Sequence, residues 1–141
     1  MNPLKLTGPE VQALIQKAFP KADPDRMPKV TEAAPGRLRM VAPFQPEMLR
    51  PGGVIAGPTL MSLADTVAYA IVLAHVGEQL MAVTSTLTMH FLRGAKPGDL
   101  VADAGLLRLG ARSAVCDVRI WTESPDALAA HATVAYALPA A

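Results

Sequence analysis

The longest apolar stretch of the chain contains a single acidic residue. From Val54 to Val76 the only formally charged side chain is that of Asp65. A helix that is apolar all round is a buried helix. The pattern therefore predicts a buried central helix from about Pro58 to about Val76. Pro58 suits the first turn, Gly57 suits the N-cap, and Gly77 suits the position after the helix end.

A membrane span is the alternative for this stretch, because about 20 apolar residues suffice to cross a bilayer. A mid-span Asp costs roughly 2.5–3.5 kcal/mol on insertion scales, and no basic cluster flanks the segment. We therefore expect a core helix of a folded domain and no membrane association.

The chain before this helix is predicted to form a shorter helix and two strands. Thr7–Phe19 has apolar residues at helical spacing, and Thr7 can cap it. Lys29–Ala34 and Arg37–Pro43 look like strands joined by a Pro-Gly turn. The segments at 20–28 and 45–53 are rich in Pro or Gly and are predicted to be loops.

The chain after the helix is predicted to form a β-meander over about 82–138. Its strands are expected at 82–91, 100–109, 113–122 and 129–138, with turn residues between them. Strict alternation places Thr84, Thr86, Thr88 and His90 on one face of the first strand, opposite Ser85, Val83, Leu87, Met89 and Phe91. In the third strand Cys116, Val118 and Ile120 face one way, with Asp117 and Arg119 opposite. We thus predict one α+β domain over 1–141, with a curved antiparallel sheet wrapped around the helix.

Composition narrows the function classes. A net charge of +1 and 4% aromatic residues give no signal for nucleic-acid binding. Cys116 is the only cysteine, which excludes an intrachain disulfide framework and fits a reducing cytoplasm. The first residues lack the apolar core of a signal peptide, so we expect a cytoplasmic protein. With 51% hydrophobic and 18% charged residues, the surface is short of charge, which favours homo-oligomerisation.

Asp65 is the main candidate for chemistry. A buried carboxylate needs a partner or a catalytic role, because unpaired burial is costly. From the residues alone, a structural role, as a salt bridge or a hydrogen bond to backbone, and a catalytic role are both open.

Three segments together resemble a known family. They are GPTLMSLADTVAYA at 57–70, TSTLTMHFLRGAKPGD at 84–99 and LLRLGARSAV at 106–115. In sequence and order they resemble the hotdog-fold thioesterases, specifically the phenylacetate-degradation (PaaI-like) branch of acyl-CoA thioesterases. The similarity spans about residues 37–138 and implies the hotdog fold.

The resemblance also implies a reaction, which is hydrolysis of an acyl-CoA thioester without a cofactor. It places the general base or nucleophile at Asp65 and the backbone N–H that polarises the thioester carbonyl at Gly57. A helix N-terminus stabilises developing negative charge, which agrees with that role.

The spacing of these two residues indicates an oligomer. Eight residues at about 1.5 Å rise put Gly57 roughly 12 Å along the helix from Asp65. One carbonyl does not reach both within one helix, whereas two antiparallel helices in a twofold dimer bring them together. The family builds its sites at such an interface, so we expect a dimer, or a tetramer made of two dimers.

The sequence departs from the family at two places. Ala56 stands where the family often has a histidine, and Arg50 lies in a loop where Asn or Gln is common. Two other functions therefore stay open: a non-catalytic binder of acyl or aromatic ligands on the same scaffold, and a hydratase or dehydratase of the same fold. His75 lies ten residues past Asp65, which fits the hydratase pattern poorly.

Further residues are candidates for substrate binding. Ser62, Asp65 and Tyr69 share one helix face and are predicted to line the acyl pocket, with core packing as the alternative. We expect Pro58 to lie beside the substrate. One of Thr84, Ser85 and Thr86 is expected to position a water molecule, with ordinary strand packing as the alternative, because Thr is common in strands. Basic residues near strand ends are candidates for CoA phosphates or are plain surface charge: Arg93, Lys96, Arg108 and Arg112. His75, His90 and His131 lack metal-ligand spacing, so no metal site is predicted.

Overall fold

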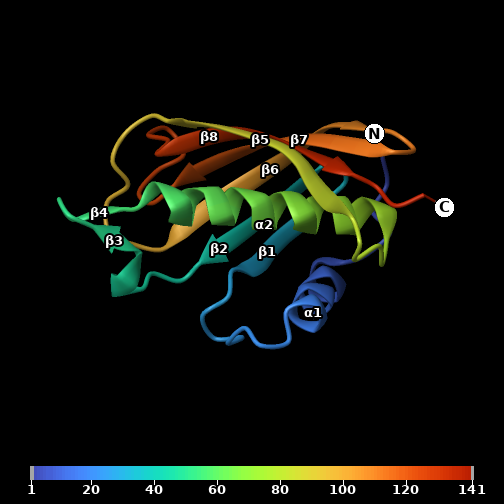
Figure 1. The fold of residues 1–141 in the computed structure, drawn as a ribbon, viewed down its shortest axis with the longest axis horizontal. Helices are drawn as coiled ribbons and strands as arrows, with labels where there is room; N and C mark the ends of the chain where they lie inside the picture. The colour runs from blue at the N-terminus through green and yellow to red at the C-terminus, as the bar shows by residue number, and fades with distance from the viewer. Residues whose placement is uncertain (1, 141) are drawn as a thin grey trace.

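The computed structural model describes residues 2–140, which form two α-helices, one 3-10 turn and eight strands. The helices are α1 (Gly8–Ala18) and α2 (Gly57–Val76), and the 3-10 turn is Pro46–Met48. The long strands are β1 (Lys29–Ala34), β2 (Arg37–Ala42), β5 (Val83–Phe91), β6 (Leu100–Leu109), β7 (Ser113–Trp121) and β8 (Ala130–Ala137). Two short strands, β3 (Leu49–Arg50) and β4 (Val54–Ile55), pair with each other just before α2 (Figure 1).

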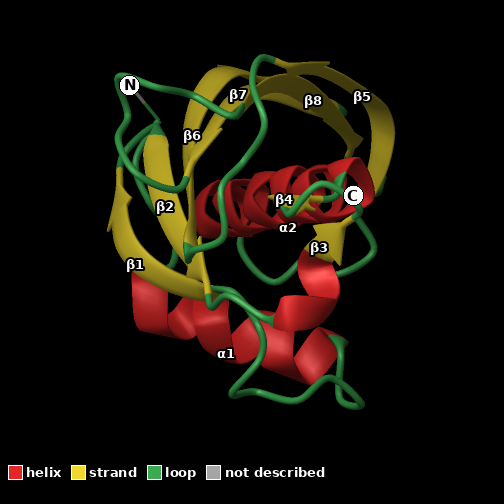
Figure 2. Cartoon of the chain, turned by 90° about the vertical axis from the view of Figure 1, so that its left-hand side faces the viewer, coloured by secondary structure: helices red, strands yellow, loops and turns green. Residues whose placement is uncertain are grey.

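The six long strands form one antiparallel sheet in the order β1-β2-β6-β7-β8-β5. Figure 2 looks nearly along α2 and shows the sheet curling around that helix. In this view β7, β8 and β5 lie above α2, and α1 lies below it. This arrangement is the hotdog fold, and it confirms the predicted α+β class.

The predicted four-stranded meander is wrong in one respect. β6, β7 and β8 do form a meander, but β5 pairs with β8 and not with β6. The segment 92–99 connects β5 to β6 across the sheet, and β7 and β8 lie between these two strands. β5 is therefore an edge strand. Periodicity located the strands, but it holds no information about which strands are neighbours. The hairpin of β1 and β2 also joins the same sheet, through pairing of β2 with β6.

Helix α2 is the core element of the domain. Its residues from Val67 to Ala74 are buried, and the sheet covers them. α2 is the only described helix long and apolar enough to cross a membrane, and 67% of its most apolar window is buried inside the fold. The burial accounts for the apolar composition of the segment without a bilayer.

The ends of α2 agree closely with prediction, with one correction. Ala56, not Gly57, is the N-cap, and Gly57 is the first helical residue. At the other end Gly77 adopts a φ of 89° and its N–H donates to the Leu73 carbonyl, 2.9 Å away. A positive φ of this kind is tolerated by glycine, which explains why the helix ends there.

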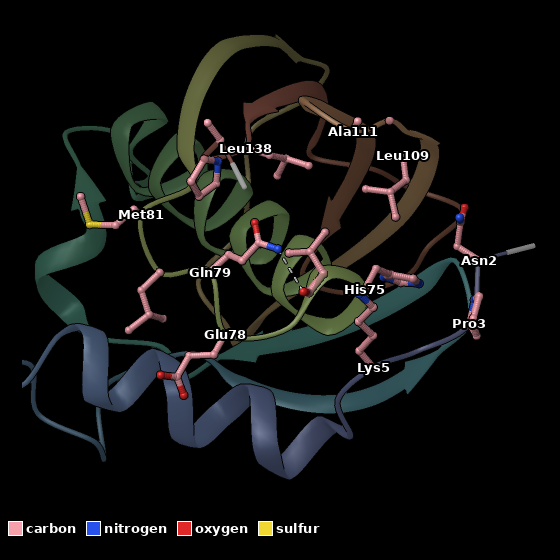
Figure 3. A pocket seen from close by; sticks show the side chains of 15 residues that line it. Asn2, Pro3, Lys5, His75, Glu78, Gln79, Met81, Leu109, Ala111 and Leu138 are labelled. Carbon is pink, nitrogen blue, oxygen red and sulfur yellow. Dashed lines mark hydrogen bonds between the residues drawn. The ribbon is translucent and has the colours of Figure 1, made fainter.

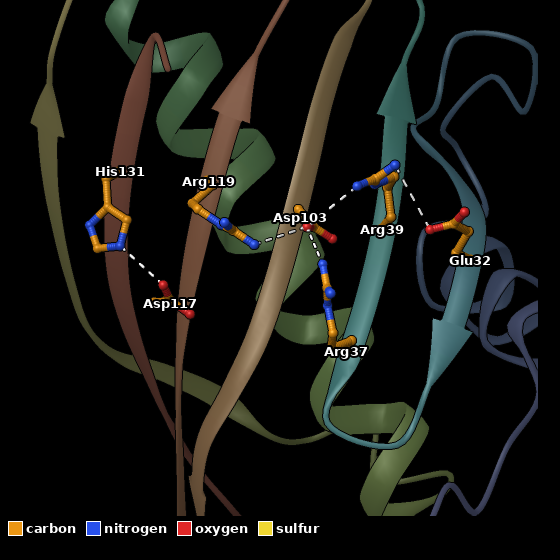
Figure 4. A network of polar contacts seen from close by, with 7 residues as sticks. All are labelled: Glu32, Arg37, Arg39, Asp103, Asp117, Arg119 and His131. Atoms are coloured by element: carbon orange, nitrogen blue, oxygen red, sulfur yellow. Dashed lines mark hydrogen bonds and ion pairs between the residues drawn. The ribbon is translucent and has the colours of Figure 1, made fainter. Parts of the chain in front are cut away.

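The outer face of the sheet carries an ion network remote from the helix (Figure 4). Asp103, 5% exposed, accepts from Arg37, Arg119 and Arg39 at 2.6, 3.2 and 3.5 Å. The arginines come from β2 and β7, the two neighbours of β6. Along β7 the side chains alternate between the two faces of the sheet, which places Arg119 and Asp117 opposite the buried Val118 and Ile120, as predicted. The network satisfies a buried carboxylate on the face away from α2.

Candidate active site

Asp65 projects from the middle of α2 toward the edge of the sheet made by β5 and β8. Its Oδ1 accepts a hydrogen bond from the Thr84 hydroxyl at 2.5 Å and another from the Tyr136 hydroxyl at 2.7 Å. No cation within residues 2–140 forms an ion pair with Asp65. The structural alternative of a salt bridge is therefore not what holds this carboxylate in the described chain.

A β-bulge brings Thr84 to Asp65. Thr84 pairs with Tyr136 and Thr86 pairs with Ala135, so Ser85 is an extra residue in β5. The extra residue reverses the alternation, which puts Thr84 on the helix side and leaves Thr86 on the outer side. The predicted grouping of Thr84 with Thr86 on one face is therefore wrong. The Ser85 hydroxyl donates to the Ala135 carbonyl at 3.2 Å, and this contact lies at the bulge.

Aromatic rings stand beside the carboxylate. Tyr69 and Tyr136 are stacked with centroids 5.9 Å apart, and Phe19 meets Tyr69 edge-on at 6.4 Å. The Tyr69 hydroxyl donates to the Leu80 carbonyl at 2.9 Å, which satisfies its polar end. Burial raises the pKa of Tyr69, and burial is also the main reason that the pKa of Tyr136 lies far above its usual range. Both phenols stay protonated and act as hydrogen-bond donors.

These groups line a hollow of about 400 Å³, here called the carboxylate pocket. Its walls are Phe19, Asp65, Thr66, Tyr69, Leu80, Ala82, Val83, Thr84 and Tyr136. A few polar groups in an otherwise apolar hollow are typical of a small-molecule site. Asp65, Tyr69 and Thr84 thus line the same hollow.

A second hollow, of about 550 Å³, lies at the start of α2 and is called here the helix-start pocket. Its lining includes Gly57, Pro58, Arg93, Arg50 and Phe91. The Gly57 N–H has no hydrogen-bond partner among residues 2–140, because no acceptor precedes it in the helix. An unpaired N–H at a helix N-terminus is a ready donor to an oxygen that gains negative charge.

The other predicted residues lie apart from these two pockets. Ser62 lines a different hollow, with Pro28 and Leu100, so the predicted stripe of Ser62, Asp65 and Tyr69 does not face one pocket. Arg112 lies beside the last strand, where its carbonyl accepts from the Leu138 N–H. Lys96 pairs with Glu123 at 3.5 Å on the surface. Arg93 is thus the one member of the basic set that lines a pocket with Gly57.

Another hollow, of about 660 Å³, lies at the opposite end of α2 (Figure 3). It contains His75, whose two ring nitrogens are both engaged. Nδ1 lies 2.8 Å from the Ile71 carbonyl and Nε2 accepts from the Gly36 N–H at 2.9 Å. With both nitrogens in use, His75 joins the helix end to the turn between β1 and β2 and has no lone pair left for chemistry. Within residues 2–140 no three His, Cys, Asp or Glu side chains form a metal-binding group.

Two aromatic residues of the carboxylate pocket, Tyr136 and Phe19, were missed from the sequence. Tyr136 ends the inward series Ala130, Ala132, Val134 and Tyr136 of β8, where every other member is small or aliphatic. A tyrosine at the end of an apolar stripe needs a hydrogen-bond partner for its buried hydroxyl. This feature of the sequence could have indicated Tyr136 as a pocket residue. Phe19 follows the end of α1, and no pattern in the chain connects it with Asp65.

Comparisons with known proteins identify the class. The family model of the thioesterase superfamily matches residues 52–129, a segment that includes both Gly57 and Asp65. The match covers more than half of the chain, so the chain belongs to the thioesterase superfamily. A search of curated proteins found no significant match.

Solved structures agree with this class. A candidate thioesterase from Silicibacter sp. TM1040 is 33% identical, with a TM-score of 0.87 over 97% of this chain and 94% of its own. Thioesterase superfamily member 2 of zebra fish is 19% identical, with a TM-score of 0.81 over 96% and 100% of the two chains. A thioesterase of Haemophilus influenzae is 18% identical, with a TM-score of 0.82 over 99% and 95%. The last two matches show the fold alone, whereas the first, together with the family model, supports thioester hydrolysis.

Proposed function

We propose that this protein hydrolyses an acyl-CoA thioester to the free acid and CoA, with Asp65 as general base or nucleophile. The observation that carries the proposal is the state of Asp65. Its carboxylate lies in a mostly apolar pocket, and two neutral hydroxyls hold one of its oxygens. Oδ2 accepts no hydrogen bond from residues 2–140 and remains available to a water molecule or to a thioester carbon.

In the general-base route, Asp65 takes a proton from a water molecule whose oxygen bonds to the thioester carbon. The carbonyl oxygen becomes an oxyanion, which the Gly57 N–H stabilises. The carbon–sulfur bond then breaks, and the thiolate leaves with the proton that Asp65 held. If Asp65 is the nucleophile, its oxygen bonds to the carbon first, the carbon–sulfur bond breaks and the thiolate leaves. Water then hydrolyses the resulting anhydride to the acid and Asp65, and one proton of that water ends on the thiol. An oxyanion donor of this kind typically contributes about 2.7–4 kcal/mol to lowering the barrier.

The proposed unit is a twofold dimer, in which Gly57 of one protomer serves Asp65 of the other. Within one helix these residues are roughly 12 Å apart along the axis, too far for one carbonyl. β5 is an edge strand, and Met61 (42% exposed), Met81 (77%) and Val83 (57%) are exposed on it or on the segments near it. Exposed apolar side chains beside an unpaired strand edge favour pairing with a second copy.

An acyl-CoA substrate and the PaaI-like branch belong to the same proposal. Arg50 and Arg93 line the helix-start pocket, where positive charge suits the phosphates of CoA. The hydratase alternative is disfavoured, because His75 lies ten residues from Asp65 with both nitrogens engaged. One observation favours the remaining alternative, a non-catalytic binder of acyl or aromatic ligands: the side chain of Ala56 offers no polar group at the helix start.

The test is release of free thiol from a panel of short, long and aromatic acyl-CoAs, with wild type and Asp65→Asn compared. We expect turnover with at least one acyl class in wild type and its loss in the variant. Asn is close to Asp in size, so fold and oligomer should be kept, which circular dichroism and size-exclusion chromatography check. Undiminished turnover in Asp65→Asn would refute the assignment, and ligand binding without turnover in wild type would favour the binder.

A further inference from the structure

Tyr136 makes a contact that the proposed reaction does not yet explain. Its side chain comes from β8 and is 4% exposed. The hydroxyl lies 2.7 Å from Oδ1 of Asp65 and 3.1 Å from the Asp65 backbone carbonyl. A phenol has one proton to donate. The shorter contact, to the charged acceptor, is the stronger of the two hydrogen bonds.

Thr84 donates to the same oxygen from the opposite strand of the β5–β8 pair, at 2.5 Å. Thr84 and Tyr136 are register partners, so the bulge at Ser85 and the end of β8 place both hydroxyls on one atom. We propose that Tyr136 is a positioning residue that, with Thr84, occupies Oδ1 of Asp65 and leaves Oδ2 as the reacting oxygen. This inference rests on the proposed thioesterase function.

Two physical effects follow from the pair of donors. They fix the side-chain torsion of Asp65, so that Oδ2 faces one direction within the pocket. They also occupy Oδ1, so that a water molecule or a thioester carbon meets Oδ2. Tyr136 does not itself exchange its proton in the working range, because burial raises its pKa.

The substitution Tyr136→Phe separates these effects from packing. The ring of Tyr136 is stacked on Tyr69, and a phenylalanine keeps that stack while losing only the hydroxyl. We expect kcat to fall about 10- to 100-fold with little change in KM, because the lost bond aligns the reacting group and does not hold substrate. kcat/KM should fall by about the same factor as kcat, because the alignment matters only in the transition state. Thr84→Val, which removes the other donor, should also lower kcat with little change in KM.

The matched control is Val134→Ala, at the neighbouring inward position of β8. Val134 is 1% exposed, so its truncation lowers stability without touching Asp65. A purely structural role for Tyr136 predicts that both variants lose stability and that neither lowers the kcat of the folded enzyme. A kcat of Tyr136→Phe close to that of wild type would overturn the inference.

A second readout does not depend on turnover. In protein labelled with ¹³C at Asp, the chemical shift of the Asp65 side-chain carboxyl is compared at one pH in wild type and in both variants. We expect it to change in Tyr136→Phe, which loses a hydrogen bond to that carboxylate, and to stay unchanged in Val134→Ala. The same chemical shift in wild type and Tyr136→Phe would refute the inference. Absence of thiol release from wild type would instead refute the proposed function, so the two failures are distinguishable.

Discussion

Gly57 is the residue whose role depends on its backbone rather than on a side chain. Its N–H is unpaired within residues 2–140, and Ala56 before it has φ −68° and ψ 144°. Those angles are the ones that a following proline requires, and proline is tolerated at the first position of a helix. Gly57→Pro should therefore fold, yet lack the proposed oxyanion donor. We expect kcat to fall about 10²- to 10³-fold.

The matched control at this position is Gly57→Ala, which keeps the N–H. A Cβ there would lie 3.4 Å from the edge of the Phe91 ring, a contact that a small ring movement relieves. Thiol release by the alanine variant should exceed that of the proline variant by at least tenfold. Equal activities in two variants of similar Tm would contradict the role given to the N–H.

Cys116 bears on how the reaction is measured, because thiol reagents detect any reactive thiol. It is 1% exposed, and burial, followed by the nearby charges of Asp117 and Asp65, raises its pKa to about 12. At pH 8 the thiol is therefore neutral, and only the thiolate reacts. We expect no reaction of the native protein with Ellman's reagent and one thiol per chain after unfolding in guanidinium. Rapid native labelling would contradict this buried, neutral state.

At the scale of elements, His75 joins two parts of the fold that are distant in sequence. Its side chain is 2% exposed and connects the last turn of α2 with the Gly36 N–H in the β1–β2 turn. His75→Phe removes both bonds and leaves the half-buried Gly36 N–H without this partner. We expect the free energy of unfolding to fall by about 1–3 kcal/mol, measured by urea denaturation. His90→Ala, on an exposed position of β5, should change it by less than about 0.5 kcal/mol.

Element boundaries were predictable because each depends on local chemistry. Thr7 caps α1 in a reciprocal pair with Glu10, Gly77 ends α2, and alternation marked β7. The place of β5 at the far edge of the sheet was not predictable, since strand order is decided by long-range pairing. The bulge at Ser85 was not predictable either, because a bulge is defined by the pairing of β5 with β8 and one extra residue does not change the composition of the strand. That bulge also explains why Thr84 was only one of three equal candidates.

The whole molecule leaves an apolar surface that one protomer does not cover. Met61, 42% exposed, lies on α2 between Gly57 and Asp65, the two residues that the proposed dimer brings together. In an antiparallel pairing of two such helices, the segment between these residues lies against its counterpart. A charge at Met61 would therefore be buried in the interface, opposite an identical charge of the partner. Burial of an unpaired charge costs several kcal/mol, enough to separate the protomers.

Met61→Glu should accordingly be monomeric and inactive, while its far-ultraviolet circular dichroism stays that of the wild type. The control is Leu107→Glu, since Leu107 is 62% exposed at the bulge of β6, away from α2. We expect the control to keep both the dimer and thiol release. Sedimentation velocity and activity measured at the same protein concentrations give the comparison. A monomeric Met61→Glu with wild-type turnover would show that Gly57 and Asp65 act within one chain, and would refute the shared site.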